Sequence, residues 1–110
     1  MGIDLTVATL TGAMSNASIE RRLFEIAKRL RSANEELAVV EEQFLALSEA
    51  ADEARVRSLV SETPLAHREY TEAQRHADAM GRSRTTLQTT IADMRRTQNE
   101  LLDKLVVSPD

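Results

Sequence analysis

Apolar residues recur at alternating intervals of four and three along residues 19–54. The positions are Ile19, Leu23, Ile26, Leu30, Ala33, Leu37, Val40, Phe44, Leu47, Ala51 and Ala54. This spacing places them in one stripe, here called the seam, along one side of an α-helix. No member of the stripe is polar. A stripe of this length must be covered, so the pattern predicts a second helix lying along it.

Residues 64–106 carry a second seam with the same alternating spacing. Its positions are Ala66, Tyr70, Ala73, Ala77, Met80, Arg84, Leu87, Ile91, Met94, Gln98, Leu101 and Leu105. Between the two seams, Pro64 disfavours helical backbone at the residue before it and fits the first position of a new helix. Thr63 is the predicted N-cap of that helix. We therefore predict helix one at 17–60, a turn at 61–63 and helix two at 64–106.

A turn this short requires the two helices to run antiparallel. The resulting register pairs Ala54 with Tyr70, Leu47 with Ala77 and Ala33 with Ile91, so that small residues face large ones in several layers. It also brings the acidic stretch 35–53 opposite basic residues of helix two, namely Arg75, His76, Arg82 and Arg84. The predicted fold is all-α, with two long helices in an antiparallel coiled-coil hairpin that dimerises into a four-helix assembly.

Residues 1–15 and 107–110 lie outside the two seams. Three aliphatic residues of the first segment alternate with polar ones, namely Ile3, Leu5 and Val7. This alternation is a short-strand signal, but a single strand has no partner to pair with. We expect a flexible arm at 1–15 and a flexible tail at 107–110. The alternatives are an arm that packs on a binding partner, or translation that begins at Met14.

Helix one carries further apolar residues on the side away from the seam. They are Phe24, Ala38, Val39, Leu45, Ala46, Leu59 and Val60. Apolar residues that recur along an exposed face indicate a contact surface, although single exposed ones are ordinary. The pattern favours self-association through helix one, with docking of another protein as the alternative. The candidate partner-binding residues are Phe24, Val39, Leu45 and Leu59.

The amino-acid composition argues against several classes of function. The net charge is −4, which gives no general attraction to nucleic acid. The absence of cysteine excludes disulfides and thiolate metal sites. No apolar run approaches the roughly 18 residues of a membrane span, and the first residues do not resemble a signal peptide. We therefore expect a cytoplasmic protein that does not act on membranes.

Catalytic chemistry has little support in the sequence. The two histidines, His67 and His76, are nine residues apart and so lie on different faces of a helix. Neither a glycine-rich phosphate loop nor an HExxH motif occurs. The sequence predicts no catalytic residues, no metal ligands and no cofactor, and hence a protein that is not an enzyme.

Four arginines of helix two share one heptad position away from the seam: Arg68, Arg75, Arg82 and Arg96. They can contact an acidic partner or a phosphate-bearing ligand. Alternatively, acidic residues three or four positions away pair with them and only support an exposed helix. Nucleic-acid binding is not predicted, because no aromatic residues are interleaved with these arginines.

The segment 81–86 is a local anomaly in helix two, because it combines a glycine with Ser and Thr and places Arg84 on the seam. In one interpretation Arg84 reaches Glu41, and Gly81 allows a close approach of the helices. In the other, the segment is a hinge or a ligand notch. Arg75, Arg82 and Arg84 are the candidate contacts for a ligand or an acidic partner.

These patterns favour a non-enzymatic coiled-coil module that acts as a protein-interaction scaffold or adaptor, either as a homodimer or with another protein. The alternative is a small transcription regulator that docks on RNA polymerase or a sigma factor through its charged helix faces. A ligand sensor at 81–86 is a third possibility.

Overall fold

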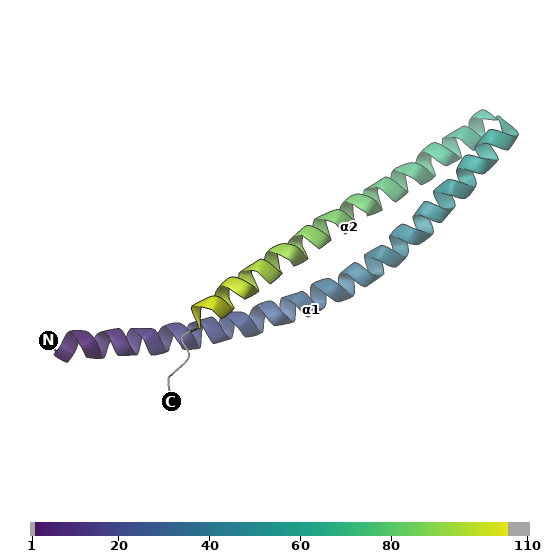
Figure 1. Cartoon of the computed structure of the whole chain (residues 1–110). Coiled ribbons are helices and arrows are strands. Elements are labelled where there is room, and N and C mark those ends of the chain that lie inside the picture. The colour runs from purple at the N-terminus through teal and green to yellow at the C-terminus, as the bar shows by residue number, and fades with distance from the viewer. Residues whose placement is uncertain (1, 106–110) are drawn as a thin grey trace. The chain divides into compact units, whose positions relative to one another are not determined.

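Two helices account for nearly all of the chain in the computed structural model, which describes the backbone of residues 2–105 and the side chains of residues 16–105. Helix α1 spans Gly2–Ser61 and helix α2 spans Pro64–Lys104 (Figure 1). No strand occurs between residues 2 and 105. The two helices pack against each other, which confirms the predicted all-α hairpin. Dimerisation stays a prediction.

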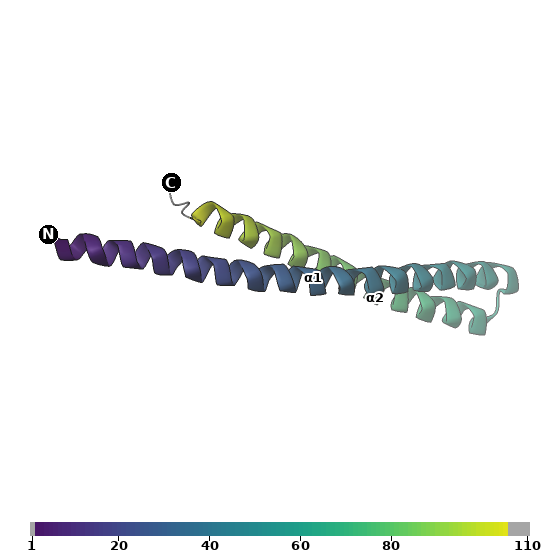
Figure 2. The ribbon, with the colours of Figure 1, turned by 90° about the horizontal axis from the view of Figure 1, so that it is seen from below.

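The turn between the helices lies where Pro64 predicts it, and Figure 2 shows it from below. The Glu62 N–H donates to the Ser58 carbonyl at 3.1 Å and closes α1. The Ala66 N–H donates to Thr63 Oγ1 at 3.1 Å, and the His67 N–H donates to the Thr63 carbonyl at 3.1 Å. Thr63 is therefore the N-cap of α2, as predicted.

Glu62 adopts a left-handed backbone conformation with φ of 52°. A side chain costs roughly 1–2 kcal/mol in this conformation, whereas glycine adopts it freely. We expect Glu62→Gly to stabilise the protein by about 1 kcal/mol, measured as the free energy of unfolding in urea. Glu62→Ala is the control, because it removes the carboxylate and keeps the Cβ. Equal stability of the two variants would contradict the prediction.

The chain divides into two compact units, which are described separately. The first unit consists of residues 33–90, with the end of α1, the turn and the start of α2. Every seam position in it is buried or half-buried. Its buried members are all alanines: Ala33, Ala51, Ala54, Ala66 and Ala77. Small side chains at these positions allow the two backbones to approach closely. Half-buried Leu, Phe and Met residues occupy other positions of the same seam.

The register of this unit agrees with the predicted pairing. Arg84 Nε lies 3.6 Å from Glu41 Oε1 across the seam. A Cβ added to Gly81 would lie 3.0 Å from Cε2 of Phe44, so the absence of a side chain at Gly81 lets the helix pass close to the ring. Both contacts are within one residue of the pairs that the turn position implies.

The second unit combines residues before 33 with residues after 90. Its described seam positions are again buried or half-buried. The buried members here are large aliphatic residues: Ile26, Leu30, Ile91 and Leu101. This unit thus has a core of bulky side chains, whereas the buried positions of the first unit are alanines.

The predicted helix boundaries are wrong at two places. Helix α1 begins at Gly2 and not at residue 17, so the segment predicted to be an arm is helical and the alternation at Ile3, Leu5 and Val7 does not mark a strand. The segment contains no proline. Once a helix is nucleated, adding residues of weak helix propensity costs only a few tenths of a kcal/mol each, so the helix can extend through the segment. Helix α2 ends at Lys104, two residues early, where the Leu105 N–H donates to the Leu102 carbonyl at 3.2 Å. The predicted tail at 107–110 lies outside the described residues.

Candidate interaction surfaces

The side of α1 away from the seam exposes large apolar side chains within residues 33–90. Of the predicted contact residues, Val39 is 52% exposed, Leu45 60% and Leu59 66%. Val39 and Leu45 lie on neighbouring turns, whereas Leu59 lies further along α1, close to the hairpin turn. Val39 and Leu45 thus share the outer face of α1 but lie on either side of its midline, and Leu59 lies apart from both.

Sequence reasoning missed two exposed apolar residues in this unit. Val56 of α1 and Leu65 at the start of α2 are 54% and 59% exposed. Val56 lies at the heptad position directly opposite the seam, which a full heptad assignment would have found. Leu65 is the second residue of α2, beside the turn, and too few residues precede it in the helix for the apolar periodicity to indicate which side it faces.

A ridge of glutamates lies between the exposed apolar residues of α1. Glu35, Glu42 and Glu49 are seven residues apart, at the heptad position directly opposite the seam, and all are exposed. We call them the acidic ridge. The exposed residues Ala38, Val39, Leu45 and Ala46 occupy the heptad positions on either side of it. The outer face of α1 is therefore a charged line with apolar flanks rather than a continuous apolar stripe.

Phe24 belongs to the other unit and is considered there on its own. It is 76% exposed, as its position away from the seam predicts. The same unit exposes Leu102 of α2.

Arg68, Arg75 and Arg82 form a matching ridge on the side of α2 away from the seam in the unit 33–90; we call it the basic ridge. All three are exposed, and none forms an ion pair with the residues that the structure describes. Arg75 and Arg82 line an open surface hollow of about 390 Å³ beside Tyr70 and Asp78.

The acidic neighbours that were predicted to pair with this ridge have other contacts. Gln74 Nε2 donates to Asp78 Oδ1 at 2.9 Å, and Glu72 Oε1 lies 3.8 Å from His76 Nε2. The alternative interpretation, in which intrahelical ion pairs engage Arg68, Arg75 and Arg82, does not hold among the described residues. Spacing alone showed which carboxylates are within reach but not which donors compete for them.

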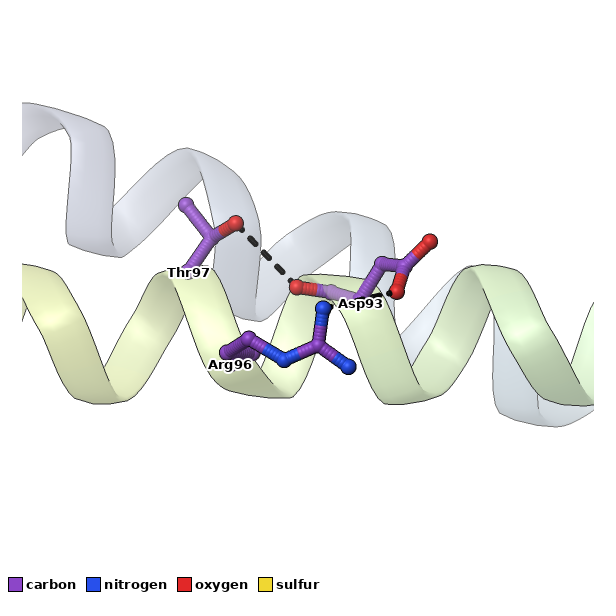
Figure 3. Close-up of polar contacts among 3 residues, drawn as sticks. All are labelled: Asp93, Arg96 and Thr97. Atoms are coloured by element: carbon purple, nitrogen blue, oxygen red, sulfur yellow. Dashed lines mark hydrogen bonds and ion pairs between the residues drawn. The ribbon is translucent and has the colours of Figure 1, made fainter.

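Arg96, the fourth arginine at this heptad position, lies in the other unit and is paired. Its Nη1 donates to Asp93 Oδ1 at 3.2 Å, and Thr97 Oγ1 donates to the Asp93 carbonyl at 3.1 Å (Figure 3). This contact is the predicted intrahelical pair. Arg96 thus differs from the three arginines of the basic ridge.

Arg84 contacts two residues of α1 across the seam, although its side chain is still 40% exposed. Besides its contact with Glu41, its Cζ lies 5.7 Å from the centre of the Phe44 ring, a cation–π distance. Helix α2 continues without a break through residues 81–86. These observations support the interpretation of Arg84 and Gly81 as packing and register features.

Arg84→Leu is expected to raise the melting temperature by a few degrees. The exposed ion pair and the ring contact contribute about 1 kcal/mol each at most, whereas a leucine side chain at this half-buried position contributes about 1–2 kcal/mol and has no charge to desolvate. Thermal unfolding followed by circular dichroism measures the change. The exposed ridge residue provides the control, since Arg82→Leu should leave the melting temperature nearly unchanged. A lower melting temperature for Arg84→Leu would contradict the prediction.

Other kinds of site find little support in the described part of the chain. No helix there is long and apolar enough to cross a membrane. Among the same residues, no group of three or more His, Asp or Glu side chains is placed to hold a metal ion.

No protein-family model matches the chain. Comparisons with curated proteins and with solved structures also find no significant similarity.

Proposed function

We propose that the chain is a non-enzymatic protein-interaction module, a scaffold or adaptor of the cytoplasm, and that its contact surface is the outer face of α1 within residues 33–90. The observation that carries the proposal is the exposure of Val39 and Leu45 on a helix whose opposite side is already covered by α2. Apolar side chains that cluster on a face without a structural role are typical of an interface.

The energetics of this face are sufficient for a specific contact. Burying about 500 Å² of apolar surface at about 25 cal/mol per Å² contributes on the order of 10 kcal/mol before the costs of association. The partner surface needs apolar groups on either side of basic ones, because the acidic ridge runs between Val39 and Leu45. A second copy of the chain supplies the basic groups, at Arg68, Arg75 and Arg82, whereas a basic amphipathic helix of another protein supplies both kinds of group.

Affinity capture from a cell lysate tests the proposal. The variant with Val39→Asp and Leu45→Asp should capture at least about tenfold less of each specific partner than the wild-type chain does, because two carboxylates replace the apolar side chains. A matched control carries Gln88→Asp and Asn99→Asp, which add the same charge at exposed positions of α2. Circular dichroism verifies that both variants stay helical. Unchanged capture by the Val39/Leu45 variant would overturn the proposal.

A small transcription regulator is the second candidate, and the two unpaired charged ridges of the unit 33–90 favour it. Docking on RNA polymerase or a sigma factor through these ridges would depend strongly on salt, because exposed charges are screened. In the same capture experiment, this candidate requires polymerase subunits or a sigma factor among the captured proteins at low salt and their loss at high salt. The ligand sensor at 81–86 is not proposed, because Arg84 is engaged at the seam.

A further inference from the structure

We infer that the chain associates with copies of itself, and that the acidic ridge of one copy docks on the basic ridge of the next. The inference rests on the proposed role of the outer face of α1 and names its partner as a second copy of this chain. It differs from a dimer in which α1 packs on α1.

The two ridges match in spacing. Glu35, Glu42 and Glu49 recur every seven residues, and so do Arg68, Arg75 and Arg82. When α1 of one copy lies antiparallel to α2 of another, one register aligns all three pairs together. These pairs are Glu35 with Arg82, Glu42 with Arg75, and Glu49 with Arg68. Helices of equal period keep such pairs in step along the whole contact.

The side chains of both ridges are available for this contact. All six are exposed, and none of them forms an ion pair with another described residue. On α2, the carboxylates nearest the arginines are held by Gln74 and His76. No intramolecular ion pair therefore has to break before the ridges meet.

The apolar residues beside the acidic ridge contribute to the same contact. Val39 and Leu45 flank the ridge, and the aliphatic stems of Arg75 and Arg82 can cover them while the guanidinium groups reach the glutamates. On α2, the exposed Ala79 lies beside the arginines and leaves room for this approach. The other residues beside the arginines are Glu72, Asp78 and threonines, so the contact rests mainly on the charged ridges and the arginine stems.

Electrostatics disfavour packing of α1 on α1 through this face. Any such contact, parallel or antiparallel, places the acidic ridge against a second acidic ridge, and facing like charges are destabilising. The basic ridge of α2 removes this conflict. The inference therefore replaces the α1-to-α1 dimer that the apolar pattern alone favours.

The two ridges point away from the seam on different helices of the same unit, so one copy can bind a neighbour through each. A contact between two different surfaces is heterologous and grows into an open series unless rotation closes it. We therefore expect a concentration-dependent series of species rather than one fixed dimer.

Sedimentation velocity of the full chain over a range of concentrations tests this, at about 0.02 M and about 0.5 M salt. Variant one carries Glu35→Arg, Glu42→Arg and Glu49→Arg; variant two carries Arg68→Glu, Arg75→Glu and Arg82→Glu. Variant three carries all six changes and keeps the net charge of −4. We expect the wild-type chain and variant three to associate at low salt, with association at least about tenfold weaker at high salt. Variants one and two should stay monomeric, and circular dichroism must show that all four chains are helical.

Three results would overturn the inference: a wild-type chain that is monomeric throughout, association of variant two equal to that of the wild type, or a folded variant three that does not associate. Equal association of variant two would instead indicate a dimer through α1 alone. The proposed function is judged separately by the Val39/Leu45 variant in affinity capture. The chain could fail to self-associate and still capture another protein through Val39 and Leu45. That result would overturn the inference and leave the proposed function in place.

Discussion

Replacing Ala51 with aspartate is expected to destabilise the unit 33–90 by about 3 kcal/mol or more, enough to unfold much of it at room temperature. Ala51 is only 2% exposed and lies on the seam, where the other buried residues of this unit are also alanines. The new carboxylate would have to displace α2 or lose its hydration. The next two residues of α1 are Asp52 and Glu53, so nearby charge would oppose the ionised form rather than stabilise it.

The neighbouring residue supplies a matched control. Ala50 is exposed, so Ala50→Asp introduces the same group one position away in the same helix. We expect it to change the free energy of unfolding by about 0.5 kcal/mol or less, as surface substitutions generally do. Urea unfolding followed by circular dichroism compares the two variants. Equal destabilisation would show that aspartate affects α1 through helix propensity and that the seam does not hold the unit together.

The success of the seam prediction has a local cause. Whether Leu37 or Ala77 faces the other helix depends on the periodicity of apolar residues, and the turn depends on Thr63 and Pro64. Both signals are contained in short stretches of sequence. No long-range information is needed to pair two consecutive helices, because a short turn leaves only one direction and few registers. The contact of Arg84 with Glu41 followed from that register.

The remaining features depend on competition that spacing does not resolve. The start of α1 at Gly2 depends on helix propagation into a segment of weak helix formers, which has no sharp sequence signal. Asp78 is four residues from both Gln74 and Arg82, so spacing allows either contact. The structure shows the contact with Gln74. This choice leaves the basic ridge unpaired. The charged and apolar residues of the candidate surface were therefore predictable, but which of the charged residues form ion pairs required the structure.

The exposed apolar residues acquire a different meaning once the acidic ridge is recognised between them. Val39 and Leu45 by themselves suggest a face that is covered by any apolar helix. With Glu42 on the line between them, the proposed contact would discriminate among partners by charge. Selectivity of this kind suits an adaptor, because the acidic residues reject partners that apolar contact alone would accept.

Leu101→Ala is expected to destabilise the other unit by about 2–3 kcal/mol, near the lower end of the range for a buried leucine. Leu101 is 6% exposed, and the buried seam residues of this unit, Ile26, Leu30 and Ile91, are also large. Alanine would leave a cavity that such side chains fill only partly. The effect stays at the lower end because a layer of only two helices can relax toward solvent. Urea unfolding measures the loss, and hydrogen exchange of the amides locates it.

Leu102 provides the comparison that separates burial from helix propensity in this unit. It is the next residue of α2 and is 50% exposed, so Leu102→Ala removes the same atoms from a position that faces solvent. We expect a change of less than about 1 kcal/mol, because alanine is the better helix former and little apolar contact is lost. A loss at Leu102 as large as that at Leu101 would mean that a partner surface covers α2 at this position. Equally small losses at both would mean that this unit contributes little to the stability of the chain.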